Sequence, residues 1–193
     1  MVGLTKTIGV LNLQGAVREH IRALEKIGVE AVSVKKEEDF NIIDGLIIPG
    51  GESTAIGRLI REHHLEDRLR QFHQDGQAIF GTCAGLILCS TDDSHPTQDL
   101  RLGFINMDVE RNGFGRQVAS FETKLDFKGI DKPVEAVFIR APYIQEVGEG
   151  VTVLAEVDGR IVAAEQNNVL VTSHHPELTD DFAVLEYFMK KVS

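Results

Sequence analysis

Cys83 has the sequence neighbours expected of a nucleophile. It stands in Gly81-Thr82-Cys83-Ala84-Gly85, between two short apolar runs. This is the cysteine form of a strand–turn–helix elbow, in which small flanking residues let the chain turn sharply. A lone cysteine is often only a small buried hydrophobic residue, but the elbow pattern favours an exposed thiol at a strand end. The N–H groups that open the next helix would favour its thiolate. Cys89, on the apolar face of the same helix, is interpreted as structural.

A base and a group that orients it could come from Ser173-His174-His175-Pro176-Glu177, which follows a predicted strand. Cysteine catalysis needs a base to form the thiolate and a third group to hold that base. His175 would face Cys83, and Glu177 would accept a hydrogen bond from the other ring nitrogen. The alternative is a strand-end histidine beside a surface glutamate. His174 is expected to be a packed or solvated residue.

A glycine-rich turn, Pro49-Gly50-Gly51-Glu52-Ser53, follows another predicted strand. Acyl transfer needs N–H donors for the developing oxyanion, and Gly51 and Ala84 could supply them from two strand ends. The same turn could instead be a simple strand–helix connection with Ser53 as the N-cap. A phosphate-binding loop is disfavoured, because the Gly-x-x-x-x-Gly-Lys-Ser/Thr pattern is missing.

The elements that must position these residues alternate in the first half of the chain. Apolar runs predict strands at 7–13, 31–34, 45–48 and 78–81, and amphipathic runs predict helices at 16–27, 54–62, 65–75 and from 84 to 89. The second half reads as strands at 102–110, 120–127, 134–139, 151–156, 160–166 and 169–173, then a helix at 181–192. This order predicts a three-layer α/β/α, flavodoxin-like fold with a mostly parallel central sheet and an antiparallel C-terminal extension. Function should gather at the C-terminal strand ends.

Composition narrows the classes of function. The chain has 193 residues, 42% hydrophobic and 26% charged, which favours one globular domain over residues 1–193. Its formal net charge of −10 disfavours nucleic acid or an anionic membrane as a partner. No apolar run is long enough to span a membrane, and no secretory signal is visible at the start. Two cysteines without a CxxC pattern favour a reducing cytoplasm. The histidines form no convincing ligand set, so no metal is predicted.

Together these residues resemble the class I (triad) glutamine amidotransferases, and more narrowly the glutaminase subunits of pyridoxal 5′-phosphate synthases. The elbow by itself indicates only the broad superfamily, whereas the first and fourth of the following motifs indicate the narrower family. The matching segments are Leu-Gln-Gly-Ala-Val-Arg-Glu-His at 13–20, Pro-Gly-Gly-Glu-Ser-Thr at 49–54, Gly-Thr-Cys-Ala-Gly-Leu at 81–86, Arg-Asn-Gly-Phe-Gly-Arg-Gln at 111–117, Phe-Ile-Arg-Ala-Pro at 138–142 and His-Pro-Glu-Leu-Thr at 175–179. They extend over almost the whole chain.

The resemblance implies a reaction and a partner. Glutamine would be hydrolysed to glutamate and ammonia through a Cys83 thioester, without a cofactor. The ammonia would pass to a synthase barrel that builds pyridoxal 5′-phosphate from a pentose phosphate and a triose phosphate. In this family the oxyanion hole is completed when the synthase docks.

The resemblance also implies site residues. The positions that match glutamine binding are Gly51, Glu52, Ser53, Arg111, Ile139 and Arg140, where an arginine could clamp the α-carboxylate. Gln14 and Gly15 match a loop that faces the partner. His174 departs from the family pattern, which has an aromatic or other apolar residue before the catalytic histidine. His175, and not His174, is the expected base, because His175 stands in the His-Pro-Glu context.

Two other functions remain open from the sequence. A cysteine hydrolase or peptidase of related fold could use the same elbow and histidine on another amide. A scaffold subunit would keep the fold without chemistry, but it would be expected to lose Cys83, His175 or Glu177, and all three are present.

Overall fold

The computed structural model describes residues 5–91, 99–111, 114 and 120–193. Its helices are α1 (Val17–Lys26), α2 (Ser53–Glu62), α3 (Glu66–Gln74), α4 (Ala84–Cys89) and α5 (Ala183–Met189), with 3-10 turns η1 (Glu37–Ile42) and η2 (Pro176–Leu178). Its strands are β1 (Thr7–Leu11), β2 (Glu30–Val34), β3 (Gly45–Ile48), β4 (Ala78–Thr82), β5 (Met107–Glu110), β6 (Ser120–Leu125), β7 (Val134–Ile139), β8 (Tyr143–Val147), β9 (Thr152–Val157), β10 (Arg160–Gln166) and β11 (Val169–Thr172).

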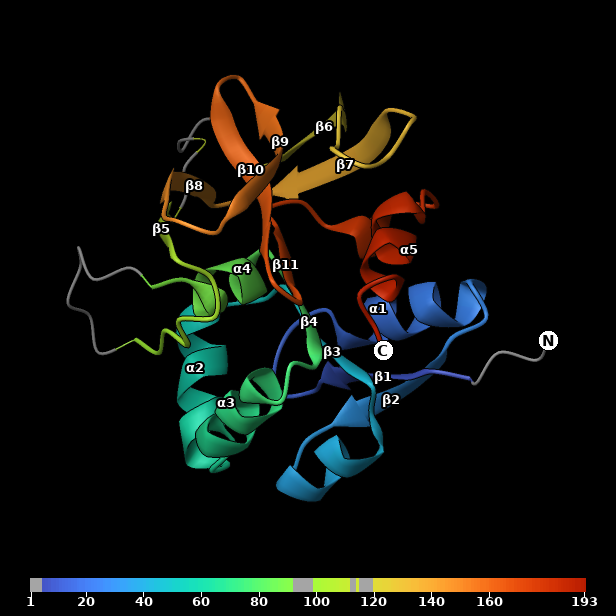
Figure 1. Cartoon of the computed structure of the whole chain (residues 1–193), viewed down its shortest axis with the longest axis vertical. Coiled ribbons are helices and arrows are strands. Elements are labelled where there is room, and N and C mark those ends of the chain that lie inside the picture. Colours follow the sequence, from blue (N-terminus) through green and yellow to red (C-terminus); the bar gives the residue numbers. More distant parts are fainter. Residues whose placement is uncertain (1–4, 92–98, 112–113, 115–119) are drawn as a thin grey trace.

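The main sheet has a parallel half and an antiparallel half (Figure 1). Strands β2-β1-β3-β4-β11 pair in that order and are all parallel. This is the 2-1-3-4-5 order of flavodoxin-like sheets, with β11 as the fifth strand. Beyond β11, strands β10, β8 and β5 continue the sheet in antiparallel pairing, and β9 pairs with β10. The predicted α/β class and the antiparallel extension are confirmed. Strands β6 and β7 form a separate hairpin.

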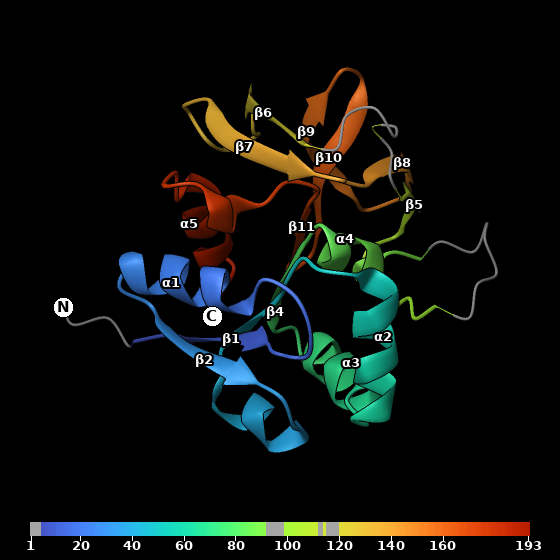
Figure 2. The same ribbon diagram turned by 180° about the vertical axis from the view of Figure 1, so that it is seen from behind.

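Helices cover both faces of the parallel half. Figures 1 and 2 show α1 and α5 on one side of the sheet, and α2, α3 and α4 on the other. Successive residues of β3 supply both cores: Leu46 and Ile48 belong to the core beneath α2 to α4, and Ile47 to the core beneath α1 and α5. A strand buried on both faces needs apolar residues throughout, so β3 reads as a continuous apolar run.

Several predicted boundaries agree with the structure. Helix α4 and strands β7 and β10 have the predicted limits. Gly28 follows the C-cap of α1 with φ of 79°, and its N–H bonds to Glu25 O at 3.0 Å.

Some predicted elements are shorter in the structure than in the prediction, and one strand was not predicted. Of the strand predicted at 102–110, only β5 forms. The chain before Met107 hydrogen-bonds to α4 instead, and the Leu102 N–H donates to Leu88 O at 2.7 Å. The helix predicted at 181–192 begins at Ala183, where the Asp181 carboxylate accepts the Ala183 N–H at 3.0 Å. Strand β8 was not predicted.

Candidate functional site

The elbow at Cys83 lies where the C-terminal ends of neighbouring parallel strands meet. Cys83 follows β4 and precedes α4, with φ of 52° and ψ of −102°. Positive φ is uncommon for a residue with a side chain and is typical of a strained nucleophile turn. The Cys83 N–H bonds to Thr172 O of β11 at 2.8 Å, and Cys83 O accepts from Ile87 N at 3.3 Å. These bonds hold the turn from both sides.

The two glycines of the elbow are required by close packing. A Cβ on Gly81 would lie 2.6 Å from Gly85 O, and a Cβ on Gly85 would lie 2.1 Å from Ile48 O of β3. Both distances are far inside van der Waals contact with backbone atoms. The Gly-x-Cys-x-Gly pattern therefore lets α4 begin directly against β3 and β4.

The expectation that Cys83 is exposed was wrong, because its side chain is enclosed. Only 8% of the residue is accessible. Its Sγ lies 4.0 Å from Ile139 O at the end of β7, and a Cβ on Gly50 would lie 3.4 Å from Cys83 Cβ. The end of β7 and the turn after β3 thus restrict access to the thiol.

His175 and Glu177 lie beside Cys83 as predicted. The backbone N–H of His175 bonds to Val137 O at 2.8 Å, which fixes this segment against β7. His175 Nδ1 lies 2.6 Å from Glu177 Oε1, and the His175 ring also hydrogen-bonds to the Cys83 side chain. The structure therefore joins the three side chains in one chain of hydrogen bonds.

The charge of His175 follows from these contacts. Burial opposes a positive ring, but the hydrogen bonds to Cys83 and Glu177 and the charge of Glu177 outweigh it and raise the pKa of His175 to about 10. Burial would likewise raise the pKa of Glu177, but the nearby His20 ring and the hydrogen bond and charge of His175 lower it. Near neutral pH the pair is therefore an imidazolium held by a carboxylate.

Two further polar residues lie beneath this cluster and were missed from the sequence. His20 of α1 is 2% accessible, and its Nε2 lies 3.5 Å from Glu177 Oε2 and 3.2 Å from Thr82 Oγ1. Thr82 is the residue before Cys83 and is fully buried. From the sequence, His20 is only the last residue of the motif at 13–20. Its role in this cluster depends on a contact with residues far away in the sequence.

His174 is packed rather than solvated. It is fully buried, its ring centroid lies 5.8 Å from that of Phe138, and neither ring nitrogen has a hydrogen-bond partner among the described residues. Burial lowers the pKa of His174 to about 4, although Glu177 and Asp181 oppose this. An apolar ring would suit these surroundings.

Acid should therefore destabilise the protein through His174. Between pH 6.5 and pH 4 the unfolded chain binds a proton at this residue and the folded chain does not, so stability falls as pH falls through that range. The contribution lost between pH 7 and pH 5 is about 2 kcal/mol. We expect His174→Phe to show a smaller loss of unfolding free energy than the natural protein over this interval, measured by urea denaturation. His63→Phe, at an exposed histidine, is the control; equal pH dependence in all three proteins would contradict the prediction.

A polar cluster at the start of α2 joins three of the six residues predicted to bind glutamine, Glu52, Ser53 and Arg111. Arg111 hydrogen-bonds to Ser53 Oγ and, at 2.9 Å, to Thr54 Oγ1. It also forms an ion pair with Asp99 at 3.1 Å, and Glu52 Oε1 lies 4.0 Å from its Nη2. The structure thus brings Arg111 to the turn that holds Gly51.

The N-cap of α2 is Glu52, so the alternative interpretation of this turn, with Ser53 as the N-cap, is wrong. Glu52 Oε2 accepts the Ala55 N–H at 3.0 Å, and Ser53 is already the first helical residue. The Ser53 hydroxyl is therefore available for Arg111. Of the last predicted positions, Arg140 is exposed with φ of 44°, and Ile139 is 41% exposed with its carbonyl directed at Cys83.

The residue 14–16 loop contacts the glycine-rich turn directly. Gln14 Oε1 accepts the Glu52 N–H at 2.8 Å, and Gly50 O accepts the Ala16 N–H at 3.0 Å. A Cβ on Gly15 would lie 2.0 Å from Gly50 O, so only glycine fits there. The Gly50–Gly51 peptide is trans, so the Gly51 N–H points in the opposite direction to the Gly50 carbonyl and away from this loop. The loop therefore sets the orientation of the Gly51 N–H.

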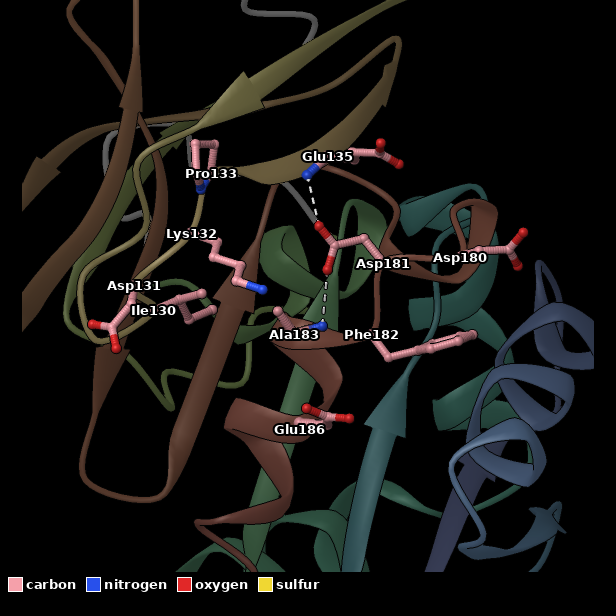
Figure 3. A pocket seen from close by; sticks show the side chains of 10 residues that line it. All are labelled: Ile130, Asp131, Lys132, Pro133, Glu135, Asp180, Asp181, Phe182, Ala183 and Glu186. Carbon is pink, nitrogen blue, oxygen red and sulfur yellow. Dashed lines mark hydrogen bonds between the residues drawn. The ribbon is translucent and has the colours of Figure 1, made fainter.

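A separate groove lies between β7 and α5 (Figure 3). Its volume is about 750 Å³, and its lining includes Asp131, Lys132, Glu135 and Glu186. The Asp181 carboxylate, which also lines the groove, already accepts two backbone N–H groups, from Glu135 and Ala183, each at 3.0 Å. No residue of the Cys83 cluster lines this groove.

Within the described ranges, no group of three or more histidine, cysteine, aspartate or glutamate side chains is arranged to hold a metal ion. No helix in this part of the chain is long and apolar enough to cross a membrane. In the motif at 111–117, only Arg111 and Phe114 are among the described residues.

Comparisons with known proteins agree with the motifs. A curated relative from Niallia circulans, named pyridoxal 5′-phosphate synthase subunit PdxT, is 54% identical over 185 residues and covers 96% of this chain and 97% of its own. A relative of the same name from Bacillus velezensis is 55% identical over 184 residues, covering 95% and 93%. A crystal structure described as a glutamine amidotransferase has a TM-score of 0.91 and 46% identity, covering 95% of this chain and 97% of that one. The model of the SNO glutamine amidotransferase family matches residues 10–193, and the chain therefore belongs to that family.

Proposed function

We propose that this chain is the glutaminase subunit of a pyridoxal 5′-phosphate synthase, acting in the cytoplasm as one domain over residues 1–193. The observation that carries the chemistry is the hydrogen-bonded chain from Cys83 through His175 to Glu177. Family membership favours the side-chain amide of glutamine over other amides, and it disfavours a scaffold without activity. The curated relatives supply the name of the assembly.

The reaction follows from the cluster. The Cys83 thiolate attacks the side-chain amide carbon of glutamine, and the carbonyl π electrons move to oxygen to give a tetrahedral intermediate. His175 gives its proton to the amide nitrogen, the C–N bond breaks, and ammonia leaves behind a γ-glutamyl thioester. His175 then removes a proton from water, which attacks the thioester, and Cys83 leaves with glutamate as the product. Glu177 holds the His175 ring in one orientation throughout.

The oxyanion would be stabilised by the N–H groups of Gly51 and Ala84. Ala84 opens α4 directly after Cys83, so its N–H lies at the positive end of a helix. The Gly50–Gly51 peptide is held by the residue 14–16 loop. A synthase subunit docking on Gln14 and Gly15 would therefore act on one donor of the hole, and the ammonia would pass to that subunit.

Glutamine itself would lie between the start of α2 and the end of β7. Arg111 supports the turn formed by Gly51, Glu52 and Ser53, and its guanidinium is shared with Asp99. We propose that Arg111 pairs with the α-carboxylate of glutamine, and that Ile139 and Arg140 contribute from the opposite side. The Ile139 carbonyl faces Cys83 and would accept from the α-ammonium group.

Release of glutamate from glutamine tests this function. We expect the purified chain alone to be slow and the chain mixed with the synthase subunit of the same organism to be at least tenfold faster, by an order-of-magnitude expectation for completing an oxyanion hole. Equal high activity in both states would retain the chemistry and overturn the activation by docking. A folded chain without activity in either state would overturn the function.

A further inference from the structure

Glu177 has one carboxylate oxygen that the proposed reaction leaves unexplained. Its side chain is fully buried, and Oε1 is 2.6 Å from His175 Nδ1. The other oxygen, Oε2, is buried and has no hydrogen-bond partner among the described residues. A buried carboxylate oxygen without a donor is costly, because it has lost its contact with water. A group that faces Oε2 therefore matters for the orientation of the whole carboxylate.

His20 is placed to be that group. Its Nε2 lies 3.5 Å from Glu177 Oε2 and 3.2 Å from Thr82 Oγ1, and all three residues are buried. A hydrogen on Nε2 can be shared between the Thr82 hydroxyl oxygen and the carboxylate. His20 thus connects the carboxylate to the residue immediately before Cys83.

We propose that His20 is a positioning residue, whose Nε2–H holds Oε2 of Glu177 and thereby keeps Oε1 directed at His175. Without this donor the carboxylate can rotate about its last bond, and the His175 ring loses its fixed partner. The inference rests on the proposed glutaminase function, since its effect is expressed through His175 and Cys83.

The charge state of His20 is consistent with this role. Burial lowers the pKa of His20 below its ordinary value; the charges of Glu177 and Glu19 raise it, and that of His175 lowers it. A neutral ring still donates one N–H to Glu177. It does not cancel the negative charge that Glu177 presents to His175, as a protonated His20 would.

The test compares two substitutions at one position in the complex with the synthase subunit. In His20→Leu the ring is replaced by an apolar group of similar size, so Oε2 loses its donor. In His20→Gln an amide N–H can occupy the place of Nε2–H. We expect kcat of glutamine hydrolysis to fall on the order of 10- to 100-fold in the leucine variant, with KM little changed because His20 does not reach the substrate. The glutamine variant should recover most of the lost rate.

The pH profile separates positioning from a general structural defect. The alkaline limb of kcat/KM should move to lower pH in His20→Leu, because a loosely held Glu177 stabilises the His175 imidazolium less. A defect in folding would lower the active fraction, counted with a glutamine-mimicking electrophile on Cys83, and would not move the limb. His73→Leu is the matched control. His73 lies in α3, is half-buried and stacks on Phe104. This control variant should leave both kcat and the limb unchanged.

A measurement on the natural protein keeps the inference falsifiable if the leucine variant fails to fold. Nitrogen-15 NMR of labelled histidine, assigned with His20→Gln, should show the proton of His20 on Nε2. A proton on Nδ1 alone would overturn the inference, as would unchanged kcat and pH limb in a folded His20→Leu or equal losses in both variants. Absence of glutaminase activity in the natural complex would instead overturn the proposed function.

Discussion

Cys83→Ala is expected to abolish glutaminase activity, with a loss on the order of 10⁴-fold or more. The chain has one other cysteine, Cys89, and its thiol cannot replace that of Cys83. Cys89 is fully buried at the end of α4, and burial raises the pKa of its thiol to about 12. The natural protein and the variant should be compared by glutamate release in the presence of the synthase subunit.

The fold should survive the substitution at Cys83. The variant loses one sulfur atom at an enclosed site, and the backbone bonds of the elbow to Thr172 and Ile87 do not involve the side chain. We expect a change in unfolding free energy of about 1 kcal/mol, measured with denaturant. Synthesis from added ammonia in the complex should also continue, since only the production of ammonia is lost.

Cys89→Ala is the matched control for this experiment. It should retain glutaminase activity while losing some stability, because it leaves a small cavity in the core. Full activity in Cys83→Ala, or loss of folding rather than of turnover, would show that Cys83 is a structural residue.

His175→Asn is expected to be nearly as damaging, with kcat lowered on the order of 10³-fold or more. Asparagine keeps a polar group of similar size but cannot carry the proton that the leaving ammonia needs. The His175 ring joins Cys83 to Glu177, so its removal breaks the hydrogen-bonded chain at its centre. The rate should be measured at saturating glutamine, where binding no longer limits it.

The adjacent histidine supplies the control. His174→Asn should lower kcat only mildly, because the His174 ring packs on Phe138 and makes no hydrogen bond to the cluster among the described residues. Both variants carry the same substitution in neighbouring positions, so a difference between them reports the role of the ring at 175. The reverse order of effects would exchange the roles of the two histidines.

Local sequence determined the elements that carry the chemistry. The glycines around Cys83 predicted the elbow, because a Cβ at either position would collide with backbone atoms. Apolar runs predicted β3 and β4 and the face of α4, since strands covered on both sides cannot tolerate polar residues. The His-Pro-Glu spacing predicted the hydrogen bond from His175 to Glu177, which joins residues only two positions apart. Strand β8 was missed because its burial is shared with partners from distant segments, β5 and β10.

Only the tertiary structure decided how closed the site is and what lies beneath it. The enclosure of Cys83 comes from the end of β7 and the Gly50 turn, which local periodicity cannot place beside β4. Glu52 caps α2, and the Ser53 hydroxyl bonds instead to Arg111, which comes from a distant loop. The contact of His20 with Glu177 joins α1 to the segment after β11. A sequence pattern reports the environment of each residue along its own strand or helix, whereas such contacts depend on which elements the sheet places side by side.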